Sequence, residues 1–216
     1  ENDAESPFDV QDIDSNIVKE GPTVPIKNIA IVIGVIVILV LIVITMIITL
    51  SVKSEASLDD YIGEIKCLYD IDSISSETPI LSENFTKNTK LDIYINNVKI
   101  KYSKEYKFSE IGINEVKFYL LENIKMDKMF KDIHTLEEVE FSSKKNAKIL
   151  SMENAFENAD SLFNITINGF DTSELTSLKG VLNNTRVVSL RNFNITSKKI
   201  TDFSYMIAGT PLDNPD

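Results

Sequence analysis

The sequence contains no tryptophan, one histidine (His134), one cysteine (Cys67) and only 7 glycines among its 216 residues. A zinc site needs several His or Cys ligands, and a catalytic triad needs a histidine beside its nucleophile. Phosphate loops, dinucleotide fingerprints and calcium loops need motifs that do not occur here. His134 is therefore interpreted as a surface or packing residue. We predict a protein that is not an enzyme and has no catalytic residue, metal site or cofactor.

An excess of basic residues is also missing. The chain has 22 Lys and Arg against 33 Asp and Glu, a net charge of -11 and a pI near 4.7. Such a chain lacks the positive surface that binds nucleic acid phosphates through counterion release, so we expect no nucleic acid partner. With 43% hydrophobic and 25% charged residues, the composition is that of a globular protein of one domain or two small ones.

A long uncharged run covers residues 28–52, and its 22 residues from Ile29 to Leu50 are almost wholly aliphatic. As a helix this stretch would rise about 33 Å, enough to cross a bilayer. We predict a signal-anchor transmembrane helix, preceded by an acidic disordered cytoplasmic tail (1–27) and followed by a juxtamembrane stalk (53–69). The protein would be a single-pass protein of the plasma membrane or cell surface. Lysines on the two sides balance, so the positive-inside rule leaves its orientation undecided, and we place the C-terminal domain outside the cell.

Alternating apolar and polar residues predict a small antiparallel, sandwich-like β-module over residues 70–123. Each strand would have one apolar face. The pair Asn96-Asn97 suits a tight hairpin turn between the first two strands, because asparagine tolerates positive φ. The alternating runs lie at 91–95, 98–102, 106–108 and 116–120.

The C-terminal part, residues 124–216, repeats an apolar-x-x-apolar-apolar pattern at spacings of 26, 26 and 25 residues. The copies begin at Met126, Met152, Leu178 and Phe203, and a strand-like tract follows each of the first three. We predict a leucine-rich-repeat solenoid of about three coils and a partial fourth, an α/β repeat with one parallel strand in each coil. Residues that alternate with the inward ones would form any ligand face: Glu138, Glu140, Asn164, Thr166, Val187 and Ser189.

The period, the M-x-x-M/A-F opening and the copy SMENAFENADSLFNITINGFDTSELTS resemble the BspA-type leucine-rich repeats, 26-residue repeats of surface proteins in protists and low-GC bacteria. The resemblance covers residues 125–212. Phe170, Asp171 and Thr172 match the family's Phe-Asp-Thr, whereas the first copy departs from it at SSKKNAKIL. The resemblance implies a surface protein that contacts other proteins or extracellular matrix.

Two kinds of covalent modification have candidate residues. Cys67 has no second cysteine to pair with, so it is either a buried thiol or the site of an intermolecular disulfide. Asn-x-Thr sequons, whose number is close to that expected by chance, make four asparagines possible N-glycosylation sites: Asn84, Asn164, Asn183 and Asn194.

Together these features predict a membrane-anchored, non-catalytic cell-surface glycoprotein for adhesion or protein-protein assembly. One alternative is a structural accessory subunit of a larger membrane complex. Gly34 is the only small break in the apolar run, which favours a lone anchor over a helix packed on neighbours. The other alternative is a self-assembling surface filament, a homo-oligomer linked through open solenoid ends or Cys67.

Overall fold

The computed structural model describes residues 26–51 and 57–212, and the chain divides into two compact units, Glu1–Glu55 and Ala56–Asp216. Each unit is described by itself. Residues 1–25 of the predicted tail, residue 52 of the predicted transmembrane helix, 53–56 of the predicted stalk and 213–216 at the end of the predicted repeats lie outside the described residues.

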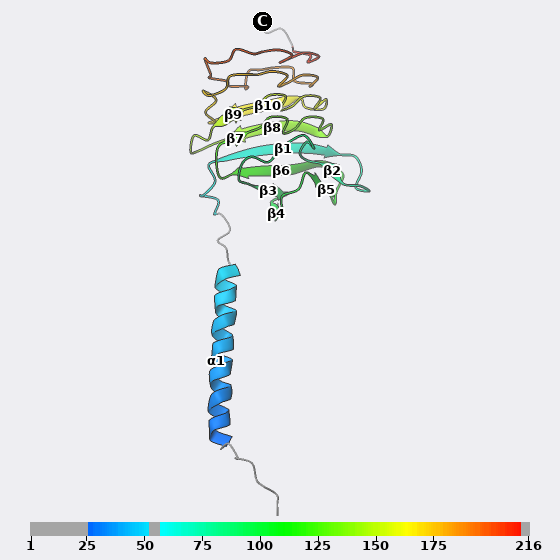
Figure 1. Cartoon of the computed structure of the whole chain (residues 1–216). Helices are drawn as coiled ribbons and strands as arrows, with labels where there is room; N and C mark the ends of the chain where they lie inside the picture. The colour runs from blue at the N-terminus through cyan, green and yellow to red at the C-terminus, as the bar shows by residue number, and fades with distance from the viewer. Residues whose placement is uncertain (1–25, 52–56, 213–216) are drawn as a thin grey trace, which may run out of the picture. The chain divides into compact units, whose positions relative to one another are not determined.

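The first unit contains helix α1 (Ile26–Ser51) (Figure 1). Its side chains are described at Ile31 and continuously over 33–44, where all are exposed. Among the residues described, no helix is long and apolar enough to cross a membrane. This finding contradicts the predicted transmembrane helix over 28–52 and the predicted single-pass location at the plasma membrane or cell surface.

The second unit is built on a six-stranded mixed sheet with the order β10-β8-β1-β6-β3-β4 (Figure 1). β10 and β8 are parallel, and every other pair of neighbours is antiparallel. Two small sheets pair β2 with β5 and β7 with β9. The bounds are β1 Gly63–Ile71, β2 Thr78–Pro79, β3 Leu91–Ile95, β4 Val98–Ile100, β5 Glu105–Tyr106, β6 Gly112–Leu120, β7 Ile124–Lys125, β8 Leu136–Ser142, β9 Ile149–Ser151 and β10 Asn164–Asn168.

The first strand of the chain, β1, lies in the middle of the sheet between β6 and β8. Its side chains alternate between the core and the outward face of the sheet. Ile65, Cys67 and Tyr69 are fully buried, while most of the residues between them are half-buried. It pairs with β6 over its whole length. β1 was not predicted: it occupies residues that were assigned to the stalk and to the start of the β-module.

The predicted hairpin is confirmed. β3 and β4 pair across Asn96 and Asn97, whose φ angles are 46° and 66°. The Asn96 carboxamide also ties the turn to β6, where its Oδ1 accepts the Glu115 amide at 3.0 Å. Asparagine adopts this left-handed conformation more readily than most residues, which explains why the chain reverses here.

One hydrophobic core runs beneath the sheet and continues through the repeats. Phe118 of β6 meets Phe130 of the first copy edge-on, with ring centroids 5.7 Å apart. Phe130 in turn stacks on Phe156 of the second copy at 5.5 Å. The predicted fold class, an antiparallel module followed by a separate solenoid, is therefore wrong, because both parts share one mixed sheet and one core.

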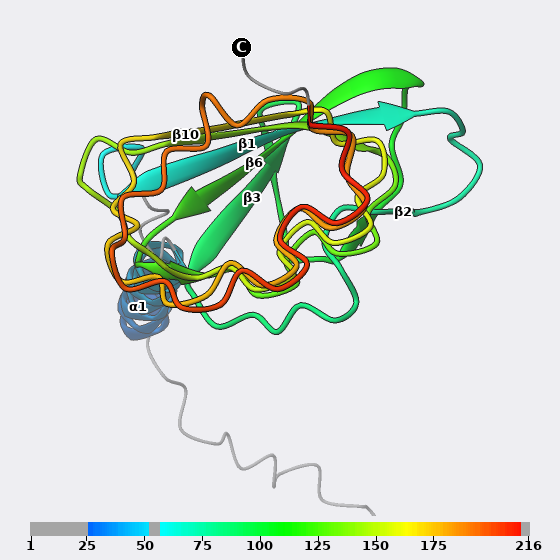
Figure 2. The same cartoon turned by 90° about the horizontal axis from the view of Figure 1, so that it is seen from above.

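The turns of the repeat copies lie one above another (Figure 2), joined by backbone bonds between residues about one repeat apart. The Phe130 amide donates to Ala155 at 2.8 Å, and the Phe156 amide donates to Val181 at 3.1 Å. Strands, however, occur only in the first two copies. Over 178–212 the described chain forms no strand, so the predicted leucine-rich-repeat solenoid with one parallel strand in each copy is not seen. In the third copy Thr185 and Val187 are buried, whereas Val187 was expected on the outward ligand face.

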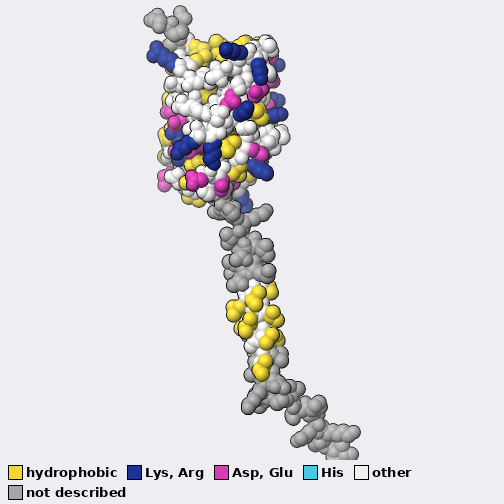
Figure 3. Space-filling view, turned by 90° about the vertical axis from the view of Figure 1, so that its left-hand side faces the viewer, with side chains coloured by type: hydrophobic (Ala, Val, Ile, Leu, Met, Phe, Trp, Pro, Cys, Tyr) yellow, Lys and Arg dark blue, Asp and Glu magenta, His cyan; other side chains and the backbone are white. Residues whose placement is uncertain are grey.

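The last copy differs from the others in burial. Phe203 is 56% exposed, whereas Met126, Met152 and Leu178 at the same position are 0%, 0% and 2% exposed. Hydrophobic side chains gather at this end of the folded unit (Figure 3). The first residue of each copy is therefore buried by the copy that follows it in the sequence.

Candidate binding face of the sheet

Half-buried polar side chains form a continuous row across the outward face of the sheet. The strand registers align them side by side, because residues paired on neighbouring strands project to the same face. The row crosses from the repeats to the hairpin and consists of Thr166, Glu140, Lys66, Lys117, Tyr94 and Lys99.

Four of the six predicted ligand-face residues lie on this face. Asn164 pairs with Glu138, and Thr166 with Glu140, between β10 and β8. The Asn164 amide donates to the Glu138 carboxylate at 3.0 Å. The other two do not join them: Val187 is fully buried and Ser189 is exposed in a segment without strand.

Three carboxylates on the face have lysine partners. Glu140 pairs with Lys66, and this hydrogen bond raises the pKa of Lys66. Glu115 pairs with Lys117 at 3.0 Å, and Asp92 with Lys99 at 3.0 Å. Each pair is partly exposed, so it contributes about 0–1 kcal/mol and mainly holds its side chains in place.

Three tyrosines cluster at one end of the face. The rings of Tyr61 and Tyr119 stack with centroids 4.8 Å apart, and Tyr94 meets Tyr119 edge-on at 5.1 Å. The Tyr61 hydroxyl donates to Asp92 at 2.6 Å. Burial, followed by this bond, raises the pKa of Tyr61. Burial alone would raise the pKa of Asp92, but the bonds from Tyr61 and Lys99 lower it overall.

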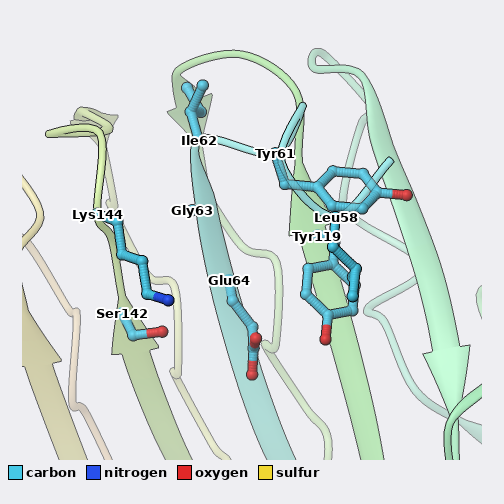
Figure 4. A pocket seen from close by; sticks show the side chains of 8 residues that line it. All are labelled: Leu58, Tyr61, Ile62, Gly63, Glu64, Tyr119, Ser142 and Lys144. Carbon is cyan, nitrogen blue, oxygen red and sulfur yellow. The ribbon is translucent and has the colours of Figure 1, made fainter. Parts of the chain in front are cut away.

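A pocket of about 240 Å³ opens beside this tyrosine cluster (Figure 4). β8 supplies Ser142 on one side, with Lys144 just beyond its end, and β6 supplies Tyr119 on the other. Glu64 of β1 lies between them. The whole lining is Leu58, Tyr61, Ile62, Gly63, Glu64, Tyr119, Ser142 and Lys144.

The pocket residues were not predicted from the sequence, because they come from segments that are far apart in the chain. Ser142, Glu64 and Tyr119 become neighbours only through the registers of β8, β1 and β6. The alternation in GEIKCLYDI was the available signal for β1, since it buries every second residue.

The sequon asparagines lie in different surroundings. Asn84 is exposed beside β2, and Asn164 projects from the ligand face. Asn183 is half-buried, and the hydroxyl of its sequon residue Thr185 donates internally to Leu182 at 3.0 Å. Asn194 is exposed but donates its amide to Ile167 at 3.1 Å.

The single cysteine and the single histidine lie apart. Cys67 is fully buried in the middle of β1, and burial raises the pKa of its thiol. A disulfide to another chain would require the sheet to open. His134 lies on an exposed part of the repeats, where its Nδ1 is 2.8 Å from Oδ1 of Asp160. Within 26–51 and 57–212, no group of His, Cys, Asp or Glu has an arrangement that could hold a metal ion.

No protein-family model, curated protein or solved structure matches this chain. The resemblance to BspA-type repeats stays an expectation from the sequence, and the geometry of the face is what bears on function.

Proposed function

We propose that the folded unit is a non-catalytic binding module that contacts another polypeptide through the outward face of its sheet. The observation that carries this proposal is the continuity of the face, which joins residues of the repeats to the tyrosine cluster in one surface. Tyrosine provides large contact area at low entropic cost, and flanking charge pairs give register and specificity.

The charges on this face favour a basic partner. Carboxylates on β1, β3, β6 and β8 exceed the lysines on the same strands, and the chain as a whole has a net charge of -11. A basic polypeptide would therefore be attracted to it at low ionic strength. Lysines pair with Glu140, Glu115 and Asp92 on the face, so recognition depends on local pairs as well as on net charge.

Stacking of copies end to end has less support. At the start of the stack, Ser82 donates its amide to Met129 at 2.9 Å, and Ile80, Leu81 and Phe85 are buried. This segment covers the first copy, so the last copy of another molecule has no open coil on which to stack.

The test is selection of peptides from a random displayed library on the immobilised protein. We expect enrichment of basic peptides whose affinity falls roughly tenfold in Glu140→Lys, because the reversed charge repels them. The matched control is Glu174→Lys, which reverses a carboxylate paired with Lys199 outside the six strands. Equal loss in both variants, or no enrichment, would refute binding through this face.

A further inference from the structure

We propose that the pocket beside Glu64 receives an arginine side chain of the polypeptide partner. The inference deepens the proposed function and rests on it. It begins with Glu64, a half-buried carboxylate of the outward face that lines the pocket and forms no ion pair among the described residues.

Glu64 differs from four neighbouring carboxylates of the face, which have partners. Asp92, Glu115 and Glu140 each pair with a lysine, and Glu138 accepts the Asn164 amide. Among the described residues Glu64 has no ion pair, although it is half-buried and lines the pocket. Lys66 and Lys117 interact electrostatically with Glu64 but form their ion pairs with Glu140 and Glu115, so the partly desolvated Glu64 gains a charge-assisted pair from an incoming cation.

The aromatic wall selects the kind of cation. Tyr119 projects into the same pocket, and its pKa is raised first by burial and then by the nearby Glu64. Ile62 and Leu58 add apolar surface. A guanidinium can stack on an aromatic ring, pair with a carboxylate through its edge and place its aliphatic stem on apolar residues, whereas an ammonium offers only a point charge.

The size of the pocket suits one side chain. At about 240 Å³ it is smaller than the cavities of roughly 300–1,000 Å³ that enclose whole small-molecule ligands. It is also open on the sheet face, where the row of polar residues continues (Figure 4). A partner lying along the row would therefore insert a side chain here.

Lys144 competes with the incoming cation. It is exposed, it lines the wall opposite Tyr119, and it forms no ion pair within the described segments. Its ammonium repels a guanidinium and can turn toward Glu64 when the pocket is empty. Removing this charge should therefore strengthen arginine binding.

The test is an NMR titration of the whole chain with N-acetyl-arginine amide, with N-acetyl-citrulline amide as the neutral probe of the same shape. We expect the arginine probe to shift amide signals around Glu64, Tyr119 and Lys144, and citrulline to bind roughly tenfold more weakly, the size of one charge-assisted hydrogen bond. Glu64→Gln should lose the difference between the probes.

Glu174→Gln is the matched control, because it neutralises a carboxylate outside both the pocket and the six strands, and it should bind the probe like the unaltered chain. Lys144→Gln should bind arginine more tightly. Equal binding of the two probes, unchanged binding in Glu64→Gln, or no shifts at the pocket would overturn the proposal. If peptide selection succeeds and this titration fails, the binding face stands but the pocket does not receive arginine. If the titration succeeds and peptide selection fails, binding of a polypeptide through the face is refuted.

Discussion

The antiparallel strands and the repeat copies hold their backbones in different ways. β1 and β6 pair over nine residues, so one register fixes the whole length of both strands. The repeats rely on short turns, each of which bonds to the turn about one repeat further along the chain. These turn bonds continue into the last copy, where Leu182 donates to Met206 at 2.8 Å although no strand is present there. Stacking of the copies therefore depends on their turns more than on their strands.

The turns achieve this through repeated left-handed residues. Lys128, Asn154, Gly180 and Tyr205 occupy the same position of four successive copies, with φ of 58°, 52°, 59° and 56°. In the antiparallel part, positive φ is confined to Asn96, Asn97 and Gly112 among the residues described there. The antiparallel part thus has positive φ at single turns only, whereas the repeats have it at the same position of every copy.

The largest effect is expected where stacking buries an aromatic ring. Phe156→Ala should lower the free energy of unfolding by about 3–5 kcal/mol, because the ring is fully buried against Phe130. Ile207→Ala removes the residue at the same position of the last copy, which is 44% exposed, and should cost less than about 1 kcal/mol. Urea unfolding compares the two, and similar losses would mean that stacking does not decide burial here.

A smaller effect should distinguish the two kinds of turn. Gly180 has φ of 59°, and a Cβ there would collide with the Asn154 side chain. Gly180→Ala should therefore lower the free energy of unfolding by about 2 kcal/mol, because left-handed strain adds to the displacement of the Asn154 side chain. Gly112 has φ of 86° and open space around it, so Gly112→Ala should cost only about 1 kcal/mol, the strain alone. Thermal unfolding measures both, and a larger loss at Gly112 would contradict the role assigned to the repeated turns.

The smallest effect concerns the charge pairs of the antiparallel part. The pKa of Asp92 lies below its usual value in the folded chain, so its ionised form stabilises the fold above the pKa of the unfolded state, and this contribution disappears as pH falls through the folded pKa. Asp92→Asn should lower the free energy of unfolding by less than about 1 kcal/mol at pH 7, because the Asp92 side chain is partly exposed. Near about pH 2 the variant and the unaltered chain should be closer in stability. Urea unfolding at the two pH values measures the change, and a difference that grows on acidification would contradict this sign.

Local patterns predicted several elements correctly. The hairpin at Asn96 and Asn97 and the strands β6, β8 and β10 all follow from alternation and from residues that tolerate a turn. The same method missed β1, and it assigned the third copy a strand that the structure lacks. In the structure Thr185 occupies the position of Ile133 and Ala159 in the earlier copies, because its amide makes the equivalent turn bond, and Val187 lies inward two residues later.

The candidate site was predicted only in part. Glu138, Glu140, Asn164 and Thr166 were identified because alternation places them opposite inward residues. Tyr61, Glu64 and Lys144 were not, since nothing local relates them to one another or to the repeats.

By itself the sequence determined the repeat period, the turn residues and the inward and outward faces of most strands, because these depend on φ preferences and on alternation within a few residues. Only the tertiary structure decided that β1 lies between β6 and β8, that the antiparallel strands and the repeats share one core, and that Glu64 lines a pocket with Tyr119 and Lys144. The physical reason is that sheet pairing joins segments distant in the chain, and its energy comes from packing between them rather than from any local preference.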